Sequence, residues 1–195
     1  MAMPVRPRSK KRWTVHEVRA LRAQPNDGVR YELVDGELLV TPSPTGLHQM
    51  AVDLLWAALY PYVKAHKLGL ASTAPRDVDL EPDNTTQPDV FVVPPGEIER
   101  FLGSQPVQQL LLAAEVLSPG SARHDRVRKR NYFQRNVVSE YWIVDLEARV
   151  VERWRPDDER PQIIVAAVEW SPAGTSAPFV LELAAYFAEV FREDS

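Results

Sequence analysis

The sequence predicts an α/β fold, in which helices flank a central mixed β-sheet and a β-hairpin lies near the N-terminus. The hairpin is indicated by two alternating apolar runs on either side of Asp35 and Gly36. The mixed sheet is indicated by an apolar strand, a helical segment and a second apolar strand between residues 110 and 145. Such a succession needs a crossover connection and at least one parallel pair of strands. The length of 195 residues suits a single domain.

The composition excludes several classes of protein. Because the chain has no cysteine, it has no disulfide framework, no cysteine-bound zinc and no thiol nucleophile. No segment approaches the ~18 continuous apolar residues of a membrane span, and no apolar signal-peptide core follows the basic N-terminus. We therefore expect a soluble, cytoplasmic protein without a membrane partner. Residues 1–12 are expected to be a basic flexible tail, and residues 13–195 a single domain.

The first elements are predicted from capping and turn residues. Thr14 and Glu17 have the spacing of a capping box, so a short helix is expected to begin there and to end near Ala23. The hairpin follows, because a type I′ turn needs positive φ at both central residues and Asp35-Gly36 adopts it at low cost.

Four further helices are predicted along the chain. Apolar residues recur at helical spacing over residues 46–66, where Pro61 is expected to kink or divide the helix. Shorter helices are expected over residues 98–102, 121–135 and 181–191.

The strands are predicted from short apolar or alternating runs. They are expected over residues 70–73, 77–80, 89–93, 110–118, 140–145, 149–154 and 163–170. The run DVFVV at 89–93 and the run LLLAAEVLS at 110–118 are almost wholly apolar, as in strands that are buried on both faces.

Two carboxylates interrupt these apolar strands. Asp89 begins one run and Glu115 lies inside the other, where a carboxylate is costly unless it is paired, protonated or bound to a cation. If the two strands are neighbours, the carboxylates converge and could bind Mg²⁺ together with water molecules. Simpler explanations stay open, because Asp89 could be a turn residue after Pro88 and Glu115 a buried partner of an arginine.

The segment 121–135 adds a cation to this picture. Asp125 and Lys129 are four residues apart, which is also the spacing of an ordinary intrahelical ion pair. The helix begins just after the strand that carries Glu115, so one of its faces can place a lysine over the metal site. A cation there could orient a water nucleophile or stabilise a pentacovalent phosphate.

The same segment carries a run of arginines. The net charge of −4 argues against a chain that coats nucleic acid by bulk charge, but this local run could contact a phosphodiester backbone. A solvated helix face would explain the run equally well. The arginines expected to contact nucleic acid are Arg123, Arg126, Arg128 and Arg130.

Together, these segments resemble the Uma2 family of the PD-(D/E)XK, or restriction-endonuclease-like, superfamily. The matching blocks, in order, are YELVDGELLVTPSPTGLHQMAV, QPDVFVV, AAEVLSPGS and SEYWIVD. The resemblance implies a restriction-endonuclease-like fold and metal-dependent phosphodiester hydrolysis. It implies Asp89 and Glu115 as ligands of Mg²⁺ or Mn²⁺, with the backbone carbonyl of Val116 completing the site.

One position departs from the superfamily pattern. The lysine of the (D/E)XK element should follow the acid by two residues, and Leu117 stands there. Uma2 proteins carry this lysine on the following helix, where Lys129 matches it, so the resemblance implies Asp89, Glu115 and Lys129 as catalytic residues. The family often has a tyrosine four residues later, but here Phe133 takes that place beside Tyr132.

Three residues are expected to support the site. Glu32, in the hairpin, is a further acid that the resemblance suggests, although an exposed strand carboxylate is the alternative. His48 opens the long helix and matches a polar position of the family, although a lone histidine is often structural. Asp125 completes this group. Trp142, in contrast, lies in an apolar strand and is expected in the core.

We therefore hypothesise a Mg²⁺- or Mn²⁺-dependent endonuclease that acts on DNA. The alternative is an inactive nucleic-acid-binding or protein-interaction module that keeps the nuclease fold, which the displaced lysine and the acidic net charge favour. A two-carboxylate glycosidase fits poorly, because no aromatic sugar platform is evident. No base-reading motif identifies a target. A homodimer is the default expectation, because cutting both strands of a duplex favours two copies of a one-site enzyme.

Overall fold

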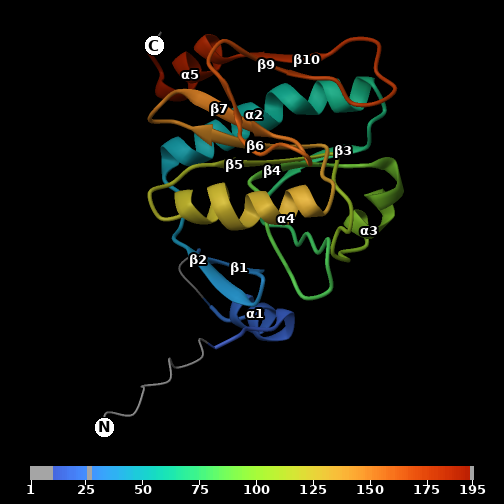
Figure 1. The fold of residues 1–195 in the computed structure, drawn as a ribbon, viewed down its shortest axis with the longest axis vertical. Coiled ribbons are helices and arrows are strands. Elements are labelled where there is room, and N and C mark those ends of the chain that lie inside the picture. The colour runs from blue at the N-terminus through green and yellow to red at the C-terminus, as the bar shows by residue number, and fades with distance from the viewer. Residues whose placement is uncertain (1–10, 26–27, 194–195) are drawn as a thin grey trace.

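A six-stranded mixed β-sheet forms the centre of the computed structural model, which describes residues 11–25 and 28–193 (Figure 1). Its strands lie in the order β3-β4-β5-β6-β7-β8. The pair β5 and β6 is parallel and the other neighbours are antiparallel, so the predicted crossover is confirmed. The strands are β3 (Leu70–Thr73), β4 (Val90–Val93), β5 (Leu112–Val116), β6 (Glu140–Asp145), β7 (Val150–Trp154) and β8 (Gln162–Ile164).

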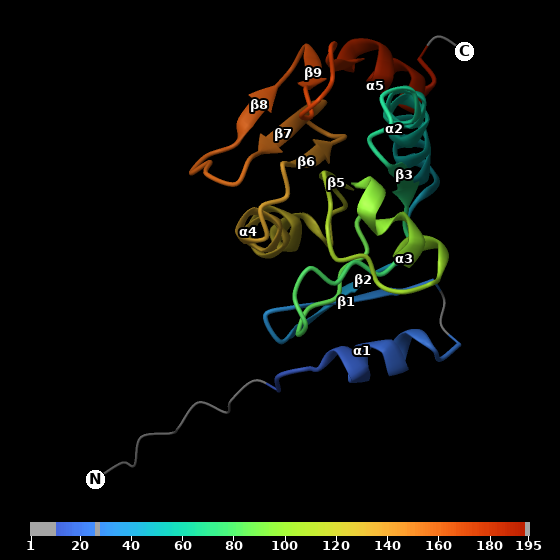
Figure 2. The ribbon, with the colours of Figure 1, turned by 90° about the vertical axis from the view of Figure 1, so that its right-hand side faces the viewer.

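Helices cover both faces of this sheet. On one face, α2 (Gly46–Ala65) and α5 (Leu183–Phe191) pack against apolar side chains of β4, β5 and β6. On the other face lies the crossover segment, which consists of η2 (His124–Lys129) and α4 (Arg130–Arg135). Figure 2 shows α2 and α4 nearly end-on, on opposite sides of the sheet. This alternation of apolar side chains between two cores explains why the middle strands are apolar throughout.

A further layer lies beyond α4. It contains α1 (Val15–Arg22) and the hairpin of β1 (Arg30–Val34) and β2 (Glu37–Thr41), as Figure 1 shows. The predicted capping box of α1 is present. The predicted turn is confirmed as well, because Asp35 and Gly36 have φ values of 56° and 76°. Residues 1–10 of the predicted basic tail lie outside the described residues.

The remaining helices largely follow the prediction. The helix α2 continues through Pro61, so the expected division of this helix does not occur. A short helical connection is formed by η1 (Pro95–Glu97) and α3 (Ile98–Leu102). Within the described part of the chain, no helix is both long enough and apolar enough to cross a membrane.

The predicted strand at residues 77–80 is wrong. This segment is a loop in which Val78 makes isolated bridges to two other segments. Its alternating pattern arises because Val78 is buried in the core, while Asp77 and Asp79 form ion pairs with arginines of α1. The alternation of polar and apolar residues in this segment therefore comes from a loop with one buried side chain between two acids, and not from a β-strand.

The predicted strand at residues 163–170 is two strands. The first strand, β8, belongs to the main sheet. The second, β9 (Ala167–Trp170), lies outside it and pairs with β10 (Phe179–Glu182), a strand that the sequence pattern did not predict. In this small ribbon Trp170 lies opposite Phe179, and both pack into the core beside α2. Burial of these two aromatic rings explains why the chain changes direction after β8.

The predicted helix at residues 121–135 is not α-helical throughout. Its middle section, η2, is a π-helix of six residues, and α4 continues from it. Such π-helical turns are rare and are often found at functional sites.

Gly69, between α2 and β3, provides a test of the fold. Its φ is +120°, and a Cβ atom there would lie 1.9 Å from the carbonyl oxygen of Val93. Gly69→Ala should therefore lower the free energy of unfolding by about 1–3 kcal/mol, measured by urea denaturation. Gly96→Ala is the matched control, because a Cβ atom there meets nothing within 4 Å. Equal stability of both variants would contradict the described connection.

Candidate active site

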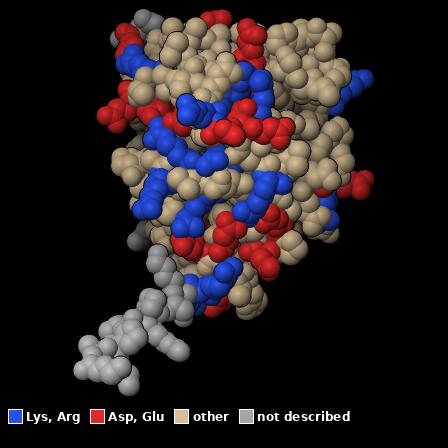
Figure 3. Space-filling model, viewed as in Figure 1, with Lys and Arg blue, Asp and Glu red and all other residues tan. Residues whose placement is uncertain are grey.

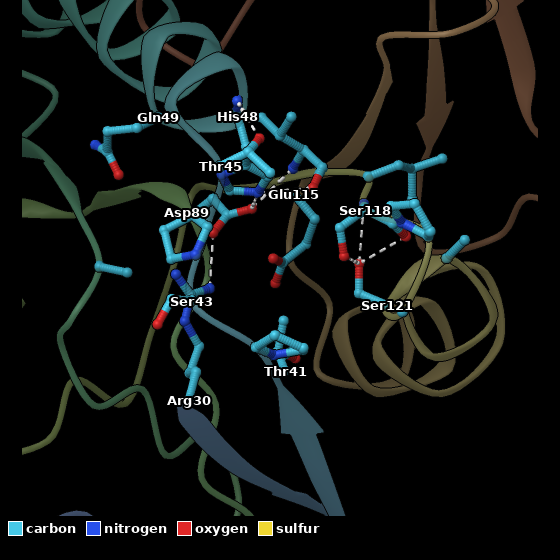
Figure 4. Close-up of a pocket in the computed structure, with 18 of the residues that line it drawn as sticks. Arg30, Thr41, Ser43, Thr45, His48, Gln49, Asp89, Glu115, Ser118 and Ser121 are labelled. Carbon is cyan, nitrogen blue, oxygen red and sulfur yellow. Dashed lines mark hydrogen bonds and ion pairs between the residues drawn. The ribbon is translucent and has the colours of Figure 1, made fainter. Parts of the chain in front are cut away.

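The two acids predicted in the apolar strands face each other across β4 and β5. Val90 pairs with Ala114 in this antiparallel pair, and one step further along the register Asp89 lies opposite Glu115. Directly opposed side chains leave the sheet on the same face. Both acids line one pocket of about 980 Å³ (Figure 4). The predicted convergence of the two carboxylates is therefore present.

Asp89 is buried and surrounded by hydrogen-bond donors. Arg30 donates to Oδ1 over 2.7 Å, and the backbone N–H of Val116 donates to Oδ2 over 2.9 Å. The ring of His48 lies 3.2 Å from Oδ2. Burial by itself would raise the pKa of Asp89, but the hydrogen bond from His48 and the charge of Arg30 hold it well below its usual range. Asp89 is therefore ionised at neutral pH.

His48 connects two of the three groups that were predicted as metal ligands. Its Nε2 lies 3.0 Å from the carbonyl oxygen of Val116 and 3.2 Å from Oδ2 of Asp89. Both partners are acceptors, so Nε2 carries a hydrogen. The other ring nitrogen, Nδ1, is buried and has no hydrogen-bond partner among the described residues. The first turn of α2 thus places a donor between the carboxylate of Asp89 and the end of β5.

Lys129 is buried among three acids. Its Nζ lies 2.7 Å from Glu32, 2.9 Å from Glu115 and 3.4 Å from Asp125. All of these side chains are at most 3% exposed, so Glu32 is not the exposed strand carboxylate considered as an alternative. The second oxygen of Glu32 accepts the backbone N–H of Gln87 over 2.7 Å. The pair of Asp125 and Lys129 is therefore part of a buried cluster that joins the hairpin, the sheet and η2.

The pKa values of Glu115 and Lys129 are both raised in this cluster, for different reasons. Burial raises the pKa of Glu115 well above its usual value; the charge of Lys129 opposes this shift, and the neighbouring acids add to it. Burial also works against the ammonium of Lys129, but the three acids outweigh it and raise the pKa of Lys129 well above its usual value. Lys129 therefore keeps its proton at neutral pH and cannot accept one.

These residues suit a divalent cation. The buried group contains four carboxylates but two Arg or Lys side chains, Arg30 and Lys129, so it carries two excess negative charges when fully ionised. Asp89, Glu115 and the carbonyl of Val116 offer the oxygen ligands that Mg²⁺ prefers. In the part of the chain that is described, no three His, Asp or Glu side chains form a metal-binding group. Mg²⁺ commonly uses one or two carboxylates and completes its shell with water and phosphate.

The arginines that were predicted to contact nucleic acid lie along η2 and at the start of α4. In Figure 3, Lys and Arg side chains on this face alternate with Asp and Glu rather than forming a separate basic patch. Arg126 donates to Asp145 over 2.8 Å and to Glu152 over 2.6 Å. The four arginines are Arg123, Arg126, Arg128 and Arg130.

The other three arginines differ in their surroundings. Arg128 forms an ion pair of 2.6 Å with Glu37, at the start of β2. Arg130 lies over the ring of Trp154, 4.7 Å from its centre. Arg123 is exposed. Contact of these arginines with nucleic acid therefore stays a prediction.

Sequence reasoning missed Arg30, although a signal was present. Arg30 and Glu32 are two residues apart in β1, so they lie on the same face of the hairpin. This face packs toward the sheet, where Arg30 meets Asp89 and Glu32 meets Lys129. A charged pair at strand spacing in a hairpin could therefore have indicated a second cation at the site.

The aromatic residues near Lys129 have structural positions. Phe133, which stands where the family often has tyrosine, is fully buried. The hydroxyl of Tyr132 accepts the backbone N–H of Leu80 over 2.8 Å, so it ties α4 to the loop before β4. Trp142 is fully buried, as predicted.

Comparisons with known proteins agree with this geometry. The model of the family described as "Uma2: Putative restriction endonuclease" matches residues 16–185. A crystal structure from Anabaena variabilis, described as "a putative nuclease belonging to DUF820", matches with a TM-score of 0.71 and 18% identity. The match covers 91% of this chain and 99% of that one, and at this identity it concerns the fold alone. No curated protein matches. The predicted restriction-endonuclease-like fold is thus confirmed.

The opposite pKa shifts of Glu115 and Asp89 predict opposite effects on stability. The raised pKa of Glu115 means that this group favours folding below its usual pKa and loses that contribution as pH rises through the raised value. Glu115→Gln should therefore be more stable than the wild type at pH 8, by roughly 1–2 kcal/mol, and this gain should shrink toward pH 4. Urea denaturation in the presence of a chelator measures the difference.

Asp89→Asn is the matched control. The lowered pKa of Asp89 means that its contribution is present above its usual pKa and is lost as pH falls through the lowered value. This variant should be less stable at pH 7 by about 3 kcal/mol, because Arg30 loses its buried partner, and the deficit should shrink in acid. Destabilisation by both variants at pH 8 would contradict the described charge distribution.

Proposed function

This chain belongs to the Uma2 family of restriction-endonuclease-like proteins, and we propose that it is a nuclease that hydrolyses phosphodiester bonds of DNA with Mg²⁺ or Mn²⁺ as cofactor. The observation that carries the proposal is the pocket in which Asp89 lies opposite Glu115, beside the buried ammonium of Lys129. This arrangement combines oxygen ligands for a cation with a fixed positive charge, as phosphoryl transfer requires.

In this proposal, Asp89, Glu115 and the carbonyl of Val116 hold the cation. A bound divalent cation supplies charge neutralisation at the phosphate and lowers the pKa of water. The donors around Asp89 prepare it for this role, because Arg30, His48 and the N–H of Val116 keep the carboxylate ionised and oriented. Glu115 contributes the second carboxylate from the neighbouring strand.

Lys129 acts as a fixed charge rather than as a base. Its raised pKa keeps it protonated, so it would orient the attacking water and stabilise negative charge that develops on the phosphate. Glu32 and Asp125 are positioning residues in this scheme, because Glu32 from β1 and Asp125 from η2 itself both lie within 3.4 Å of Nζ. In this proposal Lys129 takes the role of the superfamily lysine from η2 and not from β5.

A second candidate is a nucleic-acid-binding or protein-interaction module without turnover. It is favoured by the contacts of Asp89, whose two oxygens already accept hydrogen bonds from Arg30 and from the backbone of Val116. In such a module these donors would replace the cation and keep the site stable. The predicted homodimer is a separate proposal, which a light-scattering measurement of molecular mass tests.

Metal binding can be tested without knowledge of the substrate. Calorimetric titration of Mn²⁺ into the wild type should show saturable binding, and Asp89→Asn should lose it, because this variant removes one of the two carboxylates. Gly96→Ala, on η1, serves as a control that leaves the pocket unchanged. Absence of Mn²⁺ binding by the wild type would favour the module without turnover.

Cleavage provides the second test. Glu115→Gln should lower the rate of Mn²⁺-dependent DNA cleavage at least ~100-fold, because the second carboxylate is lost. Because Glu115→Gln is expected to be more stable than the wild type at pH 8, loss of cleavage by this variant at that pH would reflect loss of chemistry and not loss of folding. Products with 5′-phosphate ends would identify the wild type as a nuclease, whereas full activity of Glu115→Gln would remove this residue from the proposed site.

A further inference from the structure

The acids of the site lie in a recess rather than on an open surface. Asp89 is 3% exposed and Glu115 is 2% exposed, although both line the pocket. A DNA duplex is stiff and carries its phosphates on the outside, so it follows surfaces and open clefts. A strand without a partner can bend, and a single unstacked nucleotide can enter a recess.

Two loops frame this recess. One comprises residues 42–45, between β2 and α2, and the other comprises residues 117–122, between β5 and η2. Figure 4 shows Ser43 and Thr45 on one side of Glu115, with Ser118 and Ser121 on the other.

The two loops also come close to each other. A Cβ atom at Gly120 would lie 3.8 Å from Cδ of Pro42, which is ordinary van der Waals contact. Two walls of the pocket therefore approach each other at Pro42 and Gly120.

The charges of the pocket wall do not favour a polyanion. Binding of duplex DNA depends largely on cations that neutralise phosphates. Each of the four Lys and Arg side chains on this wall is already paired with an acid of the chain. The pairs are Arg22 with Asp77 at 2.6 Å, Arg30 with Asp89 at 2.7 Å, Arg126 with Asp145 at 2.8 Å, and Lys129 with Glu115 at 2.9 Å.

The rest of the wall suits a base and its sugar. It combines apolar side chains with a few hydroxyl groups, which is typical of pockets for small organic groups. The volume of about 980 Å³ also lies within the range of such pockets. The apolar side chains include Pro42, Pro44, Pro75, Leu117, Pro119 and Leu146.

We propose that this pocket binds an unpaired nucleotide, so that the substrate of the site is single-stranded or locally unpaired DNA. This inference rests on the proposed nuclease function and specifies its substrate class. Neighbouring phosphates of the strand would lie outside the pocket, and the phosphate attached to the bound nucleotide would reach Asp89 and Glu115. One site then suffices for one cut, so the activity does not require two copies of the chain.

Binding and cleavage are measured separately to test this inference. Fluorescence anisotropy with a labelled 20-nucleotide oligothymidine and with a labelled blunt duplex of two fully paired strands of that length, both in Ca²⁺, measures binding. We expect the single strand to bind at least ~10-fold more tightly than the duplex. Incubation of both DNAs with Mn²⁺ then measures cleavage.

The pocket itself is tested with a matched pair of variants. Gly120→Phe places a ring between the two loops and should weaken binding of the single strand at least ~10-fold. Gly96→Phe adds the same ring at an exposed glycine of η1 that is not on the pocket wall, and its binding should equal that of the wild type. Thermal unfolding confirms that both variants are folded.

Each outcome decides one of the two proposals. Equal or tighter binding of the duplex, unchanged binding by Gly120→Phe, or no binding of either DNA would overturn the inference. Selective binding of the single strand without cleavage in Mn²⁺ would support the pocket assignment and reject the nuclease function. Cleavage of the duplex without binding of the single strand would support the nuclease function and reject the pocket assignment.

Discussion

The buried ammonium of Lys129 is the interaction on which the arrangement of the layers depends. It joins Glu32 of the hairpin, Glu115 of the central sheet and Asp125 of its own helix. Glu32 is the partner that links the hairpin to Lys129, and loss of such a buried partner typically costs about 3–5 kcal/mol. The outer layer of α1 and the hairpin is therefore attached to the sheet through charge as well as through apolar contact. Lys129 and Glu115 also line the pocket.

Two acids at equivalent places in neighbouring strands acquire different properties from their surroundings. Asp89 receives hydrogen bonds from three sides and stays ionised. Burial makes the charged form of Glu115 unfavourable, and it shares its lysine with two other acids that add to this effect. Such divergence of two carboxylates is typical of sites that perform acid-base or metal chemistry. It arises here because β1 delivers Arg30 to one strand and an additional acid, Glu32, to the other.

Much of the fold and of the candidate site could be predicted from local sequence. The turn at Asp35-Gly36, the apolar strands and the crossover helix each depend on residues close together in the chain, and all were found. The spacing of Arg30 and Glu32 indicates a charged face of the hairpin, but the acid that Arg30 meets depends on how the hairpin packs beneath the sheet, which no local pattern specifies. The prediction of a strand at residues 77–80 failed for a related reason. The acids in this alternating segment pair with arginines of α1, which lie far away in the sequence.

The π-helical turn between the sheet and α4 has a consequence for how this chain can change. An α-helix rotates by about 100° per residue, whereas a π-helical turn accommodates one residue more. Deletion of a single residue within η2 would restore α-helical winding and rotate the segments before and after it relative to each other. Asp125 and Lys129 would then no longer face the same group of acids. The number of residues in this turn is therefore more tightly constrained than the identity of its exposed side chains.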